Sequence, residues 1–221
     1  NASEPSLIMA KLYEIEIDKF QASIYLSAIR SKRDVILIWM ETIKFFLINQ
    51  QPIAAKVSAK LTIEICTTSR LYCQLDSGRK IFSIAFPFSL SKEIDEFLFF
   101  SREGVNIDSK ISSEIISLIN HSGVLEKQDF SSFIDPIFEY SEYSPEIWSL
   151  MRELMLAEDA YIRYDWDEEL EDGHYHPLHH LDICYSNAGT FKVGLSHQIS
   201  REMLAEMLDK QTKCHYLRPA I

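Results

Sequence analysis

Apolar residues recur at helical spacing in two stretches near the start of the chain. The spacing predicts a first helix from Leu7 to Arg30, with an apolar stripe formed by Tyr13, Ile17, Phe20 and Ile24. A second helix is predicted from Val35 to Asn49, and it should lie in the centre of the fold because it is apolar on nearly all sides. This helical pair should pack on one face of a sheet. The alternative is a helical subdomain of residues 1–50 with a core of its own.

The pattern changes to strand alternation after Pro52. Apolar Leu61, Ile63 and Ile65 alternate with polar Lys60, Thr62 and Glu64, which is typical of a half-buried strand. Two further strands are predicted over Arg70–Asp76 and Lys80–Phe86. The residues between them, Asp-Ser-Gly-Arg at 76–79, are typical of a hairpin turn. The three segments therefore predict an antiparallel meander.

The second half of the chain predicts helices followed by strands. Residues 90–140 have a helical pattern, and Ser144-Pro145-Glu146 has the residues that favour a helix start. Strands are predicted over Ala160–Trp166, Leu178–Tyr185 and Thr190–Gly194, before a last helix that begins at Ser200. We therefore expect one α+β domain of residues 1–221, with a mostly antiparallel sheet built from the central meander and the C-terminal strands.

The charge of the chain is concentrated in its second half. The 221 residues carry a formal net charge of −11, and the segment Glu139–Asp172 holds 12 acidic residues against Arg152 and Arg163 alone. Such a surface repels a phosphate backbone, so nucleic-acid binding is not expected. A basic protein partner or a bound cation would suit this field.

Several common functional classes lack their defining motifs in this chain. Among the six glycines no phosphate-binding loop is present, and neither G-x-S-x-G nor H-E-x-x-H occurs. The four cysteines form no C-x-x-C pair, and no signal peptide is visible, so a cytoplasmic protein with free thiols is expected. The most apolar segment, Val35–Ile48, is too short for a membrane span and contains Glu41 and Lys44.

The segment from Tyr161 to Asp182 carries most of the residues that are suited to catalysis or metal binding. In the first predicted strand, alternation places Arg163 and Asp165 on one face; in the second, it places His180 and Asp182 on one face. If the two strands pair antiparallel, these four side chains gather on the same side of the sheet, within reach of one another. Arg163, Asp165, His180 and Asp182 are therefore the predicted catalytic group.

The connection between the two strands adds possible metal ligands. Five acidic residues at 167–172 are followed by His174 and His176. We expect a Zn²⁺ or Mn²⁺ site formed by His174, His176, His180 and Asp182, with Asp165 as a further candidate. The competing interpretations are a solvated acidic loop, a structural ion-pair ladder at Arg163 and Asp165, and a core histidine at His179.

The same segment resembles a known family. Arg163-Tyr164-Asp165, His176-Pro177 and His180-Leu181-Asp182 resemble the pattern of an uncharacterised bacterial family, domain of unknown function 2290, over about 60 residues from Tyr161 onward. That family has no established activity. The resemblance implies a bacterial cytoplasmic protein in which Arg163, Asp165, His176 and His180 matter together.

Two functions follow from these patterns. The first is a non-catalytic protein whose acidic C-terminal surface binds a basic protein partner. The second is a metal-dependent hydrolase, acting on a phosphoester through a metal-bound water, in which Arg163 steadies an anionic group. The hydrolase requires that the predicted catalytic group, Arg163, Asp165, His180 and Asp182, lies together in the folded protein.

Overall fold

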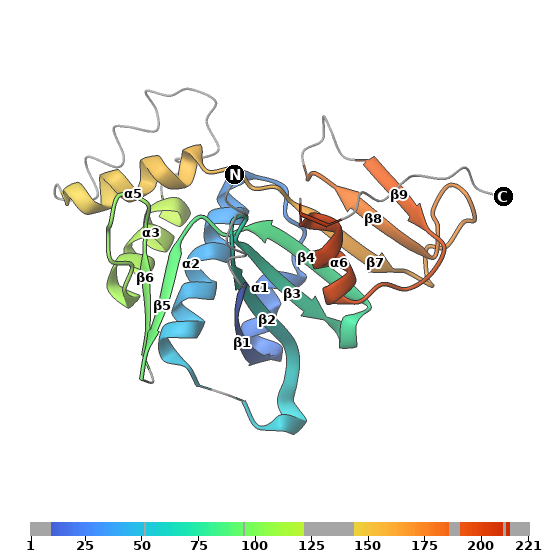
Figure 1. Cartoon of the computed structure of the whole chain (residues 1–221), viewed down its shortest axis with the longest axis horizontal. Helices are drawn as coiled ribbons and strands as arrows, with labels where there is room; N and C mark the ends of the chain where they lie inside the picture. Colours follow the sequence, from blue (N-terminus) through green and yellow to red (C-terminus); the bar gives the residue numbers. More distant parts are fainter. Residues whose placement is uncertain are drawn as a thin grey trace, which may run out of the picture.

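The computed structural model describes residues 10–50, 52–94, 96–121, 144–185, 191–209 and 211–212 (Figure 1). Its strands are β1 (Lys11–Asp18), β2 (Val57–Ile65), β3 (Arg70–Leu75), β4 (Lys80–Ala85), β5 (Ser89–Glu93), β6 (Glu96–Phe100), β7 (Ile162–Trp166), β8 (His179–Ile183) and β9 (Phe191–Leu195). Its α-helices are α1 (Lys19–Leu26), α2 (Lys32–Ile48), α3 (Ser109–His121), α5 (Pro145–Leu156) and α6 (Arg201–Leu208), and its 3₁₀ helices are η1 (Ala54–Lys56) and η2 (Asp76–Gly78).

Seven of these strands form one antiparallel sheet in the order β1-β2-β3-β4-β7-β8-β9. The meander β2–β4 and the C-terminal strands belong to the same sheet because β7 pairs with β4. Strands β5 and β6 form a separate hairpin. The predicted α+β fold, with its mostly antiparallel sheet, is confirmed.

The N-terminal helical pair is only partly present. The helix predicted from Leu7 to Arg30 is wrong over Lys11–Asp18, which is strand β1 at the edge of the sheet. Here Ile15 and Ile17 are buried while Glu14 and Glu16 are exposed, so the period is two rather than 3.6. The helix α1 starts only after Asp18, whose carboxylate caps it in a capping box with Gln21.

The region predicted to be helical between residues 90 and 140 also differs in its first part. Ile94, Phe97 and Leu98 belong to the β5–β6 hairpin and its turn, not to a helix. Phe97 and Phe99 alternate inward, and aromatic residues favour a pleated, half-buried surface. The helix around Ile115 and Leu118 is present as α3, while residues 122–140 lie outside the described part of the chain.

Helix α2 lies in the centre of the fold, as its apolar surface predicts. Ser31 caps it in a capping box with Asp34. Trp39 and Ile43 of this helix are fully buried in the same core cluster as Leu61 and Phe82 of the sheet. The helix and the meander therefore share one core.

The two halves of the sheet are covered on opposite faces. The face of β2–β4 that carries Leu61 and Phe82 packs against α2. The opposite face, with Tyr164 and Leu181, packs in a second cluster with Leu204 of α6. Arg163 is directly opposite Phe82, so the β7–β9 side chains on the first face extend the α2 side of the sheet. None of the described helices combines the length and the hydropathy that a bilayer span requires.

Candidate functional site

Two rows of cross-strand neighbours form a polar cluster on the α2 face of β7, β8 and β9. Strands β7 and β8 pair antiparallel in the register that places Arg163 opposite Asp182 and Asp165 opposite His180. On the flanking strands, Lys192 is opposite Asp182, and Lys80 is opposite Asp165. The four side chains predicted to gather on one face therefore do so. Positive and negative groups alternate both along and across the strands.

Arg163 connects the two carboxylates of the cluster. Its Nε donates to Asp165 Oδ2 at 2.6 Å, and its Nη2 donates to Asp182 Oδ2 at 2.5 Å. Burial opposes the charge on Arg163, but neighbouring Tyr161 and the two carboxylates outweigh that effect and raise the pKa of the guanidinium above its ordinary value. Arg163 is thus a permanent cation that fixes the position of both acids.

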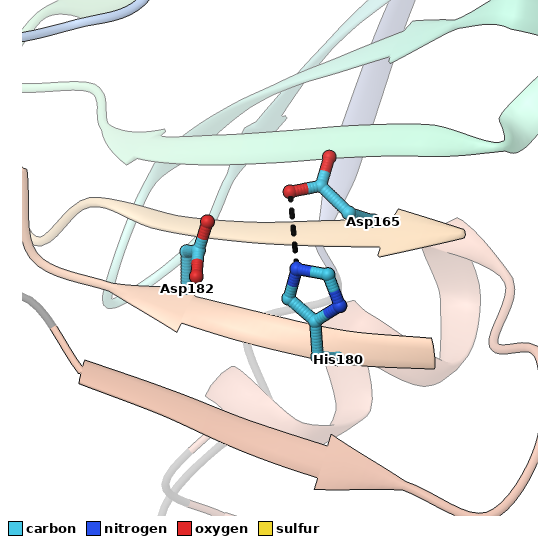
Figure 2. Close-up of side chains that lie close together, drawn as sticks. All are labelled: Asp165, His180 and Asp182. Atoms are coloured by element: carbon cyan, nitrogen blue, oxygen red, sulfur yellow. Dashed lines mark ion pairs between the residues drawn. The ribbon is translucent and has the colours of Figure 1, made fainter. Parts of the chain in front are cut away.

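The ring of His180 is held in one tautomer. His180 is 1% exposed, and its Nδ1 lies 2.8 Å from the carbonyl oxygen of Pro177, which can only accept. The Nδ1 atom therefore carries a proton, and Nε2 faces the cluster, 2.9 Å from the ammonium group of Lys192. Figure 2 shows this ring on β8 turned toward Asp165 on β7, with Nε2 3.7 Å from Asp165 Oδ2.

Asp165, His180 and Asp182 are arranged as a possible metal-ligand group. All three are buried, and one ligand atom from each lies within 4.8 Å of the others. Asp165 Oδ1 and Asp182 Oδ1 are buried oxygens that accept no hydrogen bond from any described residue, although lysine Nζ atoms lie 3.8 and 3.0 Å away. Two carboxylate oxygens beside an imidazole nitrogen are suitable ligands for Zn²⁺ or Mn²⁺.

The other two predicted ligands have different positions. The ring of His176 lies against that of His180, with centroids 4.6 Å apart, and its Nε2 is 3.9 Å from Asp167 Oδ2. His174 is exposed and does not belong to the close group of ligands in the described chain. The structure thus brings together Asp165, His180 and Asp182, with His176 beside them and His174 apart.

His179 belongs to the opposite face of the sheet. Its Nδ1 makes a 2.9 Å hydrogen bond with the hydroxyl of Tyr164, and its ring also contacts Trp166. Burial is the main cause that lowers the pKa of His179 below its ordinary value, so the neutral ring is favoured there. The side chain has the contacts of a structural histidine.

A cleft of about 910 Å³ opens beside the Asp165 side of the cluster. Arg163 and Asp165 are part of its lining, together with the start of β4 and the loop that follows β7. Arg79 also lines the cleft. Its Nη2 lies 2.6 Å from Glu168 Oε2, and its guanidinium carbon lies 4.6 Å from the centroid of the Trp166 ring. The cleft thus has basic groups near the cluster and acidic groups on the loop side.

Reasoning from the sequence missed Lys192, Lys80 and the cleft. Lys192 joins the cluster because β9 pairs with β8 in a register that places it opposite Asp182. The alternation within Phe191–Leu195 places Lys192 and Gly194 on one face, which was the available signal. Lys80 depends on the pairing of β4 with β7, which are far apart in the sequence.

Comparisons with known proteins found no relative of this chain. No family model matches it, and no significant match occurs among the curated proteins or the solved structures. The function proposed below therefore rests on the geometry of this chain.

Proposed function

We propose that this protein is a metal-dependent hydrolase that binds Zn²⁺ or Mn²⁺ through Asp165, His180 and Asp182 and acts on a phosphoester in the adjoining cleft. The observation that carries the proposal is the buried group itself, with three ligand atoms within 4.8 Å of one another on two adjacent strands. A rigid sheet holds such ligands more accurately than a loop does.

The residues present fit a borderline divalent ion. One imidazole nitrogen and two carboxylates are a common donor set that leaves a position open for water. When bound, such an ion would supply a water of lowered pKa as the nucleophile. The bond from His180 Nδ1 to Pro177 orients the ring so that Nε2 faces the cluster, and Arg163 fixes the two carboxylates. Lys80 lines the cleft and would meet an anionic group of a substrate there, a role that the sequence assigned to Arg163, which instead donates to the two carboxylates.

The charge balance of the cluster defines the competing interpretation. Arg163 and Lys192 together offset the charges of Asp165 and Asp182, so the group has counter-ions of its own. An ion-pair ladder that only stabilises the sheet would look the same. The two interpretations differ in whether the protein binds a metal ion, which is directly measurable.

Replacement of His180 by alanine is expected to remove metal binding. Wild-type protein purified without a metal-affinity column should contain about one equivalent of Zn²⁺ or Mn²⁺ by elemental analysis, because the ligands are preformed. His180→Ala should weaken the affinity by at least about a hundredfold, since a direct ligand matters no less than its supporting residues. Metal-dependent hydrolysis of bis(p-nitrophenyl) phosphate should disappear with it.

The matched control for this experiment is His174→Ala, which removes an exposed imidazole from the same segment. It should keep the metal content and the hydrolysis. Wild-type protein that holds no metal, and whose melting temperature is unchanged by added Zn²⁺ and Mn²⁺, would contradict the proposal. Equal metal loss in both variants would contradict the assignment to the buried group.

A second candidate function is the binding of a basic protein partner by the acidic loop after β7. Glu169, Glu171 and Asp172 are exposed and form no ion pair with any described residue. Neutralising them together as Glu169→Gln, Glu171→Gln and Asp172→Asn should abolish recovery of a basic partner in a pull-down. Recovery by the wild type should also fall as salt rises to about 0.5 M. Recovery that is insensitive to both changes would reject this function.

We propose further that this is a bacterial cytoplasmic protein related to domain of unknown function 2290. The motif around Arg163, His176 and His180 supports that relationship. Cys66 and Cys73 are free thiols, which supports a reducing compartment.

A further inference from the structure

The ammonium group of Lys192 lies between three side chains whose types can bind a metal ion, His176, His180 and Asp182. Its Nζ is 2.9 Å from His180 Nε2, 3.0 Å from Asp182 Oδ1 and 3.4 Å from His176 Nε2. Since an ammonium group can only donate, both imidazole nitrogens face it as acceptors. For His180 this agrees with the proton on Nδ1, which the carbonyl of Pro177 requires. Two imidazole lone pairs and one carboxylate oxygen thus already surround a cation.

We propose that Lys192 is an internal cation that occupies the metal position and that an entering metal ion must displace. The inference rests on the metal site proposed above, and it adds His176 to the ligands of that site once Lys192 has left. His176 would then bind through Nε2, next to His180 Nε2 and Asp182 Oδ1. Lys192 would set the threshold of metal concentration at which the site fills.

The position of Lys192 allows this exchange. It lies on β9, the last strand of the sheet in the described chain, and its side chain is 37% exposed. A lysine there can turn its ammonium group to water, where a compact charge is well hydrated, without disturbing the strand. Its neighbour two residues along on the same face is Gly194, opposite His180, so no other β9 side chain occupies this corner.

Arg163 cannot exchange in the same way. It is 26% exposed and donates to both buried carboxylates, so its departure would leave them without their shared donor. Each cation of the cluster therefore has a different role: Arg163 holds the acids in place, and Lys192 fills the space between the imidazoles.

The test is the affinity for Zn²⁺ and Mn²⁺ of Lys192→Met, measured by titration calorimetry on the whole chain. Removal of the competing ammonium should tighten metal binding by about tenfold, the scale of a close charge pair. The matched control is Lys80→Met, which removes another lysine next to a cluster carboxylate but one that touches no imidazole. It should change the affinity far less. Lys192→Gln, which is neutral but polar, provides a second variant if the methionine protein folds poorly.

Each outcome separates the two proposals. If the wild type binds metal and the Lys192 variants do not bind it more tightly, the inference fails and the hydrolase proposal stands. If Lys80→Met tightens binding as much as Lys192→Met, general electrostatics explains the effect and the inference fails. If only the Lys192 variants bind metal, the inference stands and the wild type is not a metalloenzyme under those conditions. If no variant binds metal, both proposals fail.

A separate variant tests whether His176 becomes a metal ligand when Lys192 is removed. His176→Ala in the Lys192→Met background should remove the gain in affinity, because His176 Nε2 would then be missing from the position that the ammonium left. The same result is not expected from His174→Ala, which lies outside the cluster. A full gain in affinity without His176 would remove this residue from the site.

Discussion

Replacement of Arg163 by methionine is expected to lower the free energy of unfolding by about 3 kcal/mol, because it leaves two buried carboxylates without their shared donor. Asp165 and Asp182 are 7% and 9% exposed, and Arg163 donates to one oxygen of each. The partial exposure of Arg163, 26%, places the effect at the lower end of what loss of a buried partner produces. Urea denaturation followed by circular dichroism measures it.

Two comparisons show whether the effect comes from the stranded carboxylates. Arg79→Met removes an arginine whose ion pair with Glu168 is exposed, and it should cost less than about 1 kcal/mol. Adding Asp165→Asn and Asp182→Asn to the Arg163→Met protein should restore much of the loss, since neutral amides need no counter-charge. An Arg163 variant no less stable than the Arg79 variant would show that the cluster contributes little to stability.

The predictable part of this site is local in the sequence. Alternation within β7 and β8 placed Arg163, Asp165, His180 and Asp182 on single faces, and the short connection of residues 167–178 favoured their antiparallel pairing. The face of β7 and β8 that carries these four residues also combines acidic and basic side chains, as a network of cross-strand ion pairs requires. These features require only neighbours along the chain, so the sequence alone contains them.

The remaining features depend on contacts between distant segments. Lys80 meets Asp165 only because β7 pairs with β4, although residues 86–161, which include α3 and α5, separate the two strands in the sequence. The cleft likewise combines residues near Leu26, Val57 and Arg79 with the loop after β7. The spacing of apolar residues within a strand does not indicate which other strand pairs with it. These contacts could therefore not be derived from the sequence pattern.

The errors at the N-terminus have a related cause. Between Lys11 and Ile24 the apolar residues fit both a helical spacing and, over Tyr13, Ile15 and Ile17, an alternating one. The unpaired edge of β2 decides between them, because β1 completes its hydrogen bonds and buries Ile15 and Ile17 against the core. A tertiary partner overrides local spacing in such ambiguous segments.

Replacement of Trp39 by alanine is expected to lower the free energy of unfolding by about 4 kcal/mol, the largest effect predicted for this chain. Trp39 is fully buried in α2, its Nε1 donates to the carbonyl of Ala85 at 2.8 Å, and its ring packs edge-on against Phe88 at 5.9 Å. The alanine variant loses the buried ring and the hydrogen bond to that carbonyl. Thermal and urea unfolding both report the loss.

Two control variants separate the effect of the lost ring volume from that of the lost hydrogen bond. The metal content shows whether the loss of stability also affects the proposed metal site. Trp39→Phe keeps most of the ring and should cost about 1–2 kcal/mol, chiefly for the bond to Ala85. Phe20→Ala removes an aromatic ring that is 87% exposed and should change stability by less than about 0.5 kcal/mol. Since Trp39 belongs to the main core and the cluster sits on β7–β9, the metal content per folded molecule should remain that of the wild type. A Trp39 variant that folds but loses metal would show that α2 packing and the polar cluster are one cooperative unit.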